Sequence, residues 1–281
     1  MLVYTHEDWK RHVTPPGNPE RVERLAAVER GLAGLQLERR ECPLAEDGEV
    51  LRCHPEGYLA KVRRAVPDAG FVALDGDTIL SPGSLDAALR AVGGICAAVD
   101  AVMAGEAKAA FVAARPPGHH AETATAMGFC LFGTVAIAVK RLLDHHGLTR
   151  VAVVDFDVHH GNGTQDLLWD EARVLFASTH EMPLYPGTGS AAERGAHGQI
   201  VNVPLRAGSG GAAMRAAYEG VILPALEDFA PEFLLISAGF DAHAADPLAN
   251  LEWQAADYAW LTGRLCAVSY THLRAHETKA N

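Results

Sequence analysis

Residues that can bind a metal or move protons follow an apolar run near the middle of the sequence. Residues 151–163 read Val-Ala-Val-Val-Asp-Phe-Asp-Val-His-His-Gly-Asn-Gly, so Asp155, Asp157 and His159 come at alternate positions. In an extended chain, alternate residues project to the same side. Carboxylates at the end of a buried strand need a cation, hydrogen-bond donors or a proton. We therefore interpret this segment as part of a functional site rather than as a solvated strand end.

A second segment supplies another carboxylate in the same way. Residues 234–243 read Leu-Leu-Ile-Ser-Ala-Gly-Phe-Asp-Ala-His, which places Asp241 after an apolar run, and Gly239 allows a tight turn there. Together, Asp157, His159 and Asp241 would offer two carboxylates and one imidazole to a metal ion. Three protein ligands leave positions open for water and a substrate carbonyl, as in catalytic rather than structural zinc sites.

A third segment carries adjacent histidines. Residues 115–120 read Arg-Pro-Pro-Gly-His-His and follow another apolar run. Near a metal, the imidazoles of His119 and His120 could serve as general base and electrostatic partner, because their pKa values lie close to neutrality. We assign no function to the other histidine pairs, at residues 145–146 and at residues 272 and 276.

Strands that alternate with helices are expected to position these residues. Short apolar runs predict strands at residues 109–113, 151–156, 174–177, 200–203 and 233–237. Helical spacing predicts helices at residues 18–35, 85–104, 131–146, 211–229 and 254–267. This alternation favours an α/β fold with a mostly parallel sheet, whose strand ends hold ligands. The irregular segment 181–198 is long enough to suggest a functional loop.

Composition and charge limit the classes of protein. The chain has 281 residues and a formal net charge of −11, which disfavours a nucleic-acid binder. The first residues lack the pattern of a signal peptide, and no apolar run approaches the roughly 20 residues of a membrane helix. The five cysteines are scattered and form no Cys-x-x-Cys, which disfavours a disulfide framework. We expect a cytoplasmic protein with one domain and with no nucleic-acid or membrane partner.

The three segments, taken with further motifs, resemble the histone deacetylase-like amidohydrolases. The likeness is greatest to the bacterial class II-like branch, near the acetylpolyamine amidohydrolases. It extends over about residues 2–267, with further motifs at residues 18–21, 74–78, 81–84, 128–130 and 246–250. It implies an α/β protein with the three-layer arginase–deacetylase fold, built on a mostly parallel sheet.

The resemblance also implies the principal site residues. Zn²⁺ would be held by Asp157, His159 and Asp241. The two imidazoles of His119 and His120 would act on the zinc-bound water and on the leaving amine.

Supporting roles follow from the same resemblance. Asp155 would orient His119, and Asn162 would face His120, where an amide tunes the imidazole less than a carboxylate would. Gly128 and Phe129 would line the substrate pocket. A monovalent cation, with K⁺ as the candidate, would be bound beside the zinc by Asp155, by Ser178, and by main-chain oxygens of Asp157, His159 and Thr179.

The implied activity is removal of acetyl groups from acetylated amines, either acetyl-lysine or acetylpolyamines. A homo-oligomer is compatible with the resemblance. Two alternatives stay open. One is a non-catalytic, metal-dependent binder of acylated amines, and the other is an arginase-like ureohydrolase with two metal ions.

Two departures from the family pattern accompany the likeness. Gly133-Thr134 stands where relatives have two asparagines. The family also continues with another strand and a Gly-Gly-Tyr motif, which this sequence does not contain, and Tyr270 lacks that context. We expect a domain at residues 1–267 whose last strand region is missing, followed by a non-native tail at 268–281, because the tail resembles a translated sequencing adapter.

Overall fold

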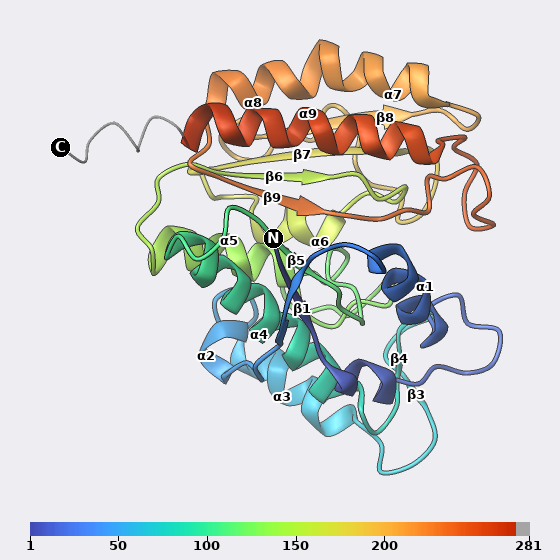
Figure 1. Ribbon diagram of the computed structural model, residues 1–281. Coiled ribbons are helices and arrows are strands. Elements are labelled where there is room, and N and C mark those ends of the chain that lie inside the picture. The colour runs from blue at the N-terminus through green and yellow to red at the C-terminus, as the bar shows by residue number, and fades with distance from the viewer. Residues whose placement is uncertain (274–281) are drawn as a thin grey trace. The chain divides into compact units, whose positions relative to one another are not determined.

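The computed structural model describes residues 1–273 (Figure 1). The chain divides into two compact units, Met1–His146 and Gly147–Asn281. Each unit contains its own group of parallel strands, so the fold is of the α/β class that the sequence predicts. No helix of the described residues is long and apolar enough to cross a membrane.

The first unit is built on three parallel strands in the order β2-β1-β5. Their bounds are Leu2–Thr5 for β1, Glu38–Glu41 for β2 and Ala110–Val112 for β5. The long helix α4 (Ser84–Met103) packs its alanine face against this sheet, and Leu2, Tyr4 and Ala98 belong to one buried cluster. Burial of this apolar face stabilises the sheet and fixes the position of β5, which leads into residues 115–120.

Shorter helices and a two-stranded ribbon complete the first unit. The helices are η1 (Glu7–Arg11), α1 (Glu23–Leu32), α2 (Asp47–Val50), α3 (Glu56–Ala65) and α5 (Thr134–Asp144). Strands β3 (Val72–Ala73) and β4 (Ile79–Leu80) pair in antiparallel fashion. The ribbon therefore brings residues 74–78 into a turn between two paired strands.

The second unit is built on four parallel strands in the order β8-β7-β6-β9. Their bounds are Val151–Asp155 for β6, Val174–Glu181 for β7, Ile200–Leu205 for β8 and Phe233–Ser237 for β9. Asp155, the last residue of β6, lies opposite Ser178 on β7 and Ser237 on β9. Because all three strands run the same way, the segments that follow them begin at the same edge of the sheet.

Three helical segments cover one face of this sheet (Figure 1). A π-helical turn, η2 (Tyr218–Ile222), joins α7 (Gly211–Ala217) to α8 (Leu223–Phe229), and α9 (Ala255–Leu273) lies beside them. Their apolar side chains form one core with the sheet. The short helix α6 (Asn162–Leu167) follows the end of β6.

The five predicted strands are confirmed, whereas several helix bounds differ. The helix predicted at 18–35 begins only at Glu23, and the one predicted at 211–229 is interrupted by the π-helical turn. The last helix runs to Leu273 rather than ending at residue 267, because no glycine or proline interrupts the segment after Gly263. The expected non-native tail overlaps this helix and, from residue 274, lies outside the described residues, so its origin stays a prediction.

Candidate active site

The turn after β6 is shaped by carboxylates that accept backbone hydrogen bonds two residues ahead. Asp155 Oδ1 accepts the N–H of Asp157 at 3.1 Å, and Asp157 Oδ1 accepts the N–H of His159 at 2.9 Å. These are Asx turns, in which aspartate replaces a backbone acceptor. The expectation of an extended segment is therefore wrong, because the strand ends at Asp155 and the side chains are gathered by consecutive turns.

Asp157, His159 and Asp241 converge within the second unit. Each offers one ligand atom, and these atoms all lie within 4.8 Å of one another. His159 Nδ1 is 3.1 Å from Asp157 Oδ1 and 3.1 Å from Asp241 Oδ2. The three side chains are only 12–17% exposed. The cluster is thus a largely buried group of two carboxylates and one imidazole that still reaches solvent.

Asp241 is fixed by the same turn and by the glycine that precedes it. Val158 donates its N–H to Asp241 Oδ1 at 2.9 Å. A Cβ atom on Gly239 would lie 2.0 Å from Asp157 Oδ2 and 2.7 Å from Asp157 Cα. Glycine is therefore required for close approach of two chain segments, whereas the sequence suggested a tight turn.

The electrostatics of this cluster favour a bound cation. Burial opposes protonation of His159, yet hydrogen bonds and charge from Asp157 and Asp241 outweigh it and raise the pKa of the imidazole to about 10. Burial, and then the charge of Asp157, raises the pKa of Asp241 to about 6. Two adjacent carboxylates thus require positive charge between them. A divalent metal fits this requirement, and oxygen and imidazole nitrogen are donors that Zn²⁺ accepts.

Ser178 and His180 continue the site into β7. The carbonyl of Gly189 accepts a hydrogen bond from His180 Nε2 at 2.9 Å, so that nitrogen carries the hydrogen. Burial lowers the pKa of His180, and the neutral ring then accepts at Nδ1 from the Ser178 hydroxyl, 2.9 Å away. Ser178 Oγ keeps its lone pairs for another partner. Of the other residues predicted beside a monovalent cation, Thr179 bonds through its hydroxyl to Tyr218 at 3.1 Å.

The irregular loop after β7 lies against this site. Thr188 Oγ1 is 2.8 Å from His160 Nδ1, and Glu193 accepts the N–H of Gly189 at 3.0 Å. The ring of Tyr185 lies 6.1 Å from the ring of His159. Sequence reasoning suggested that this loop is functional but did not single out Tyr185, whose only signal was its place in a long loop.

The first unit brings His119 and His120 together. Their ring centroids are 3.9 Å apart, and both side chains are buried. The N–H of His120 donates to Cys130 Sγ at 3.4 Å, and a Cβ on Gly128 would lie 2.3 Å from His120 Cδ2. The histidine pair is thus packed directly against the Gly-Phe-Cys motif at residues 128–130.

Asn162, which was predicted to face His120, belongs to the second unit, where it is buried at the start of α6.

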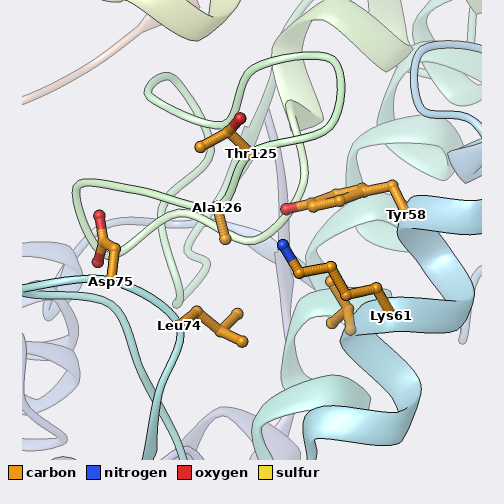
Figure 2. Close-up of a pocket in the computed structure, with 7 residues that line it drawn as sticks. Tyr58, Lys61, Leu74, Asp75, Thr125 and Ala126 are labelled. Carbon is orange, nitrogen blue, oxygen red and sulfur yellow. The ribbon is translucent and has the colours of Figure 1, made fainter.

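Gly128 and Phe129 both adopt the left-handed backbone conformation, with φ of 56° and 65°. Asp77 Oδ1 accepts the N–H of Gly128, and Thr78 Oγ1 accepts that of Phe129. Beside this turn lies a cavity of about 70 Å³, lined in part by Tyr58, Lys61 and Asp75 (Figure 2). Asp77 and Thr78 belong to one of the family motifs, but no pattern in the sequence indicated these contacts.

Two further groups of polar residues form ion pairs. Arg115, which opens the Arg-Pro-Pro-Gly-His-His motif, is buried and bonds to both carboxylate oxygens of Glu20, at 2.6 and 2.5 Å. Glu20 therefore belongs to an ion pair rather than to the predicted helix.

Asp100, His145 and His146 also lie close enough to hold a metal. Arg141, however, donates to both oxygens of Asp100, at 2.8 and 2.7 Å.

Two carboxylates and one imidazole that lie close together after parallel strands are typical of an α/β protein that binds a metal ion at that edge of its sheet. Comparison with known proteins is more specific. The profile of the histone deacetylase domain matches residues 16–275. The chain belongs to the histone deacetylase family.

Named relatives agree with this assignment. A histone deacetylase-like amidohydrolase of Pseudomonas aeruginosa is 40% identical over 265 residues, which span 93% of this chain and 69% of that protein. A probable deacetylase of Archaeoglobus fulgidus is 39% identical over 281 residues, spanning 96% and 77%. The crystal structure of the HDA15 HD domain matches with a TM-score of 0.90 and 32% identity, covering 95% of this chain and 82% of that one. The fold is the arginase–deacetylase fold, and family membership supports a deacetylase or amidohydrolase activity.

Proposed function

We propose that this protein is a zinc-dependent deacetylase that hydrolyses the acetamide of acetylated amines, with acetyl-lysine and acetylpolyamines as the substrate class. The convergence of the ligand atoms of Asp157, His159 and Asp241 within 4.8 Å supports the proposal most directly. Two carboxylates and one imidazole suit zinc and leave positions open for substrate and water. The deacetylase names of the relatives support the acetyl group as the group removed.

In this proposal the histidines of the first unit transfer the protons. Bound zinc would polarise the acetyl carbonyl and make water a better nucleophile. One imidazole of the His119–His120 pair takes a proton from the attacking water, and the other protonates the leaving amine. The two ring centroids lie 3.9 Å apart, so both imidazoles belong to one cluster.

Asp155 and Asn162 complete the proposed proton-transfer machinery. Asp155 would orient His119, and Asn162 would face His120. The carboxylate stabilises a protonated imidazole more than the neutral amide does, so the two histidines would differ in basicity. The K⁺ prediction extends the proposal: the hydroxyl of Ser178, whose hydrogen points to His180, would offer a lone pair to the cation.

The test combines metal content with turnover. Purified protein should contain about one zinc per chain by elemental analysis, and it should release the amine from a fluorogenic acetyl-lysine substrate until a chelator removes the metal. Asp241→Ala should lose both zinc and turnover. Asp228→Ala, on the exposed face of α8, should retain both. Turnover that survives complete removal of metal would contradict the proposal.

A metal-dependent binder is the second candidate. It would use the same cluster of Asp157, His159 and Asp241. Zinc and substrate would then bind without release of acetate. Two metals per chain would instead favour the binuclear, arginase-like alternative.

A further inference from the structure

The turn at residues 75–78 contacts the backbone of the predicted substrate pocket. Asp77 Oδ1 accepts the N–H of Gly128 at 3.0 Å, and Thr78 Oγ1 accepts the N–H of Phe129 at 3.1 Å. The hydroxyl of Thr78 donates its own hydrogen to Asp77 Oδ1 at 3.0 Å. A lone pair of that hydroxyl is thereby left to accept from Phe129. Two consecutive backbone donors are thus bound by two consecutive side chains.

The backbone of Phe129 needs such support. Its φ of 65° is uncommon for any residue with a side chain, whereas glycine adopts this region freely. Residues held in such a conformation persist only when their surroundings fix them. Gly128 adopts the left-handed conformation freely, because glycine has no side chain. At Phe129, the hydrogen bond from its N–H to Thr78 Oγ1 helps to hold that conformation.

The turn that supplies these acceptors is itself fixed. Asp75 Oδ1 accepts the N–H groups of Asp77 and Thr78, at 3.1 and 2.7 Å. Figure 2 shows Asp75 at the edge of the small cavity, on the opposite side from Tyr58 and Lys61. The side chain of Thr78 is buried, whereas that of Phe129 is partly exposed. A hydrogen-bonded turn anchored by the buried Thr78 therefore supports the backbone that carries a partly exposed aromatic ring.

We propose that Thr78 and Asp77 are positioning residues that set the direction of the Phe129 ring and so the fit of the aliphatic stem of the acylated amine. The inference rests on the proposed function, which makes Phe129 a wall of the substrate pocket. Asp77 acts as a hydrogen-bond acceptor, not as a charge that attracts the amine. An amide oxygen at this position could accept the same hydrogen bonds.

The experiment uses zinc-loaded protein and two ligands that differ in their stem. Acetohydroxamate has no stem, and N-hydroxyoctanamide carries a long one. Their dissociation constants are measured by calorimetry for the wild type, Thr78→Val, Thr78→Ser and Asp77→Asn. Thr125→Val is the matched control, because Thr125 lines the cavity of Figure 2 but is not a hydrogen-bond partner of Gly128 or Phe129 among the described contacts.

Thr78→Val should weaken N-hydroxyoctanamide about three- to tenfold, the effect of one lost hydrogen bond, and leave acetohydroxamate within about twofold. Thr78→Ser and Asp77→Asn should bind both ligands as the wild type does. Hydrogen exchange should be faster at the Phe129 amide in Thr78→Val and unchanged in the control. Equal weakening of both ligands, or none, would overturn the inference, as would a stem-selective loss in Asp77→Asn. Failure of the zinc-loaded wild type to bind acetohydroxamate would instead count against the proposed function.

Discussion

Replacement of Gly239 by alanine should weaken metal binding although no proposed metal ligand is replaced. The added Cβ would lie 2.0 Å from Asp157 Oδ2, 2.5 Å from Asp157 Cγ and 2.7 Å from Asp157 Cα. Ordinary van der Waals contact for carbon begins near 3.4 Å. Rotation of the carboxylate cannot relieve all three contacts, because one of them involves the backbone. The main chain at Asp157 must therefore move, and its carboxylate must move with it.

The size of the effect follows from two terms. Overpacking a buried site costs about 1–3 kcal/mol of folding stability. Displacing a ligand or its support weakens metal binding at least about 10–100-fold. At a fixed, saturating zinc concentration, a 100-fold weaker site loses about 2.7 kcal/mol of metal-linked stabilisation. Without zinc, the free energy of unfolding of Gly239→Ala should be somewhat lower than that of the wild type. The increase in this free energy on addition of zinc should be much smaller in the variant.

The assay is competition for zinc with a chromophoric chelator, together with urea unfolding in the presence and absence of zinc. Gly263→Ala is the control, since a Cβ on Gly263 in α9 meets nothing within 4 Å, and alanine favours a helix by about 1 kcal/mol. A folded Gly239→Ala protein that binds zinc with wild-type affinity would refute the reasoning, because the steric conflict would then have been relieved without moving Asp157.

Three further predictions concern separate parts of the chain. Asp241→Ala should remove bound zinc, because the described part of the chain supplies three ligands to this site, and near-stoichiometric zinc by elemental analysis would exclude this assignment. His120→Ala should keep zinc and lose about 10²–10⁴-fold in deacetylation rate, whereas His145→Ala should change little; equal effects in the turnover assay would contradict the proton-transfer role. Glu20→Gln should destabilise the fold by about 3–5 kcal/mol in urea unfolding, because it leaves the buried guanidinium of Arg115 uncompensated. Burial raises the pKa of Glu20, but hydrogen bonds from His12 and Arg115 outweigh it and hold the pKa below its usual 4.5. The stabilisation by the Glu20–Arg115 pair is therefore present at neutral pH and should be lost as the pH falls below 4.5. A wild-type protein that is equally stable at pH 3 and pH 7 would argue against this pH dependence.

The composition of the candidate metal cluster was predictable, because local sequence patterns indicate its residues. An apolar run followed by acidic residues indicates a strand with carboxylates after it, and both strands form, although β6 is buried throughout whereas β9 is mostly only partly buried. The reason for the convergence was not predictable from the alternation of residues. Asx turns at Asp155 and Asp157 gather the side chains, whereas an extended chain would have separated the residues along its length.

The first unit was harder to predict, because its structure depends on distant contacts. β2 consists of Glu-Arg-Arg-Glu and has no apolar residue to indicate a strand, yet β1 pairs with it. Glu20 appeared to begin a helix, but its partner Arg115 lies 95 positions away. The left-handed Phe129 depends on Thr78, 51 positions earlier. No local pattern encodes these distances.

The turn that carries the proposed metal ligands is held by hydrogen bonds within the protein itself. Three carboxylates accept the N–H groups of consecutive residues, since Asp155 binds Asp157, Asp241 binds Val158, and Asp157 binds His159. None of these bonds involves an ion. Demetallation should therefore be reversible without refolding, and an apoprotein prepared by dialysis should keep its circular dichroism and recover zinc on simple addition. If the metal exchanges in this way, the ion that is bound depends on which metals are available to the folded protein, and not on which metal was present while the protein folded.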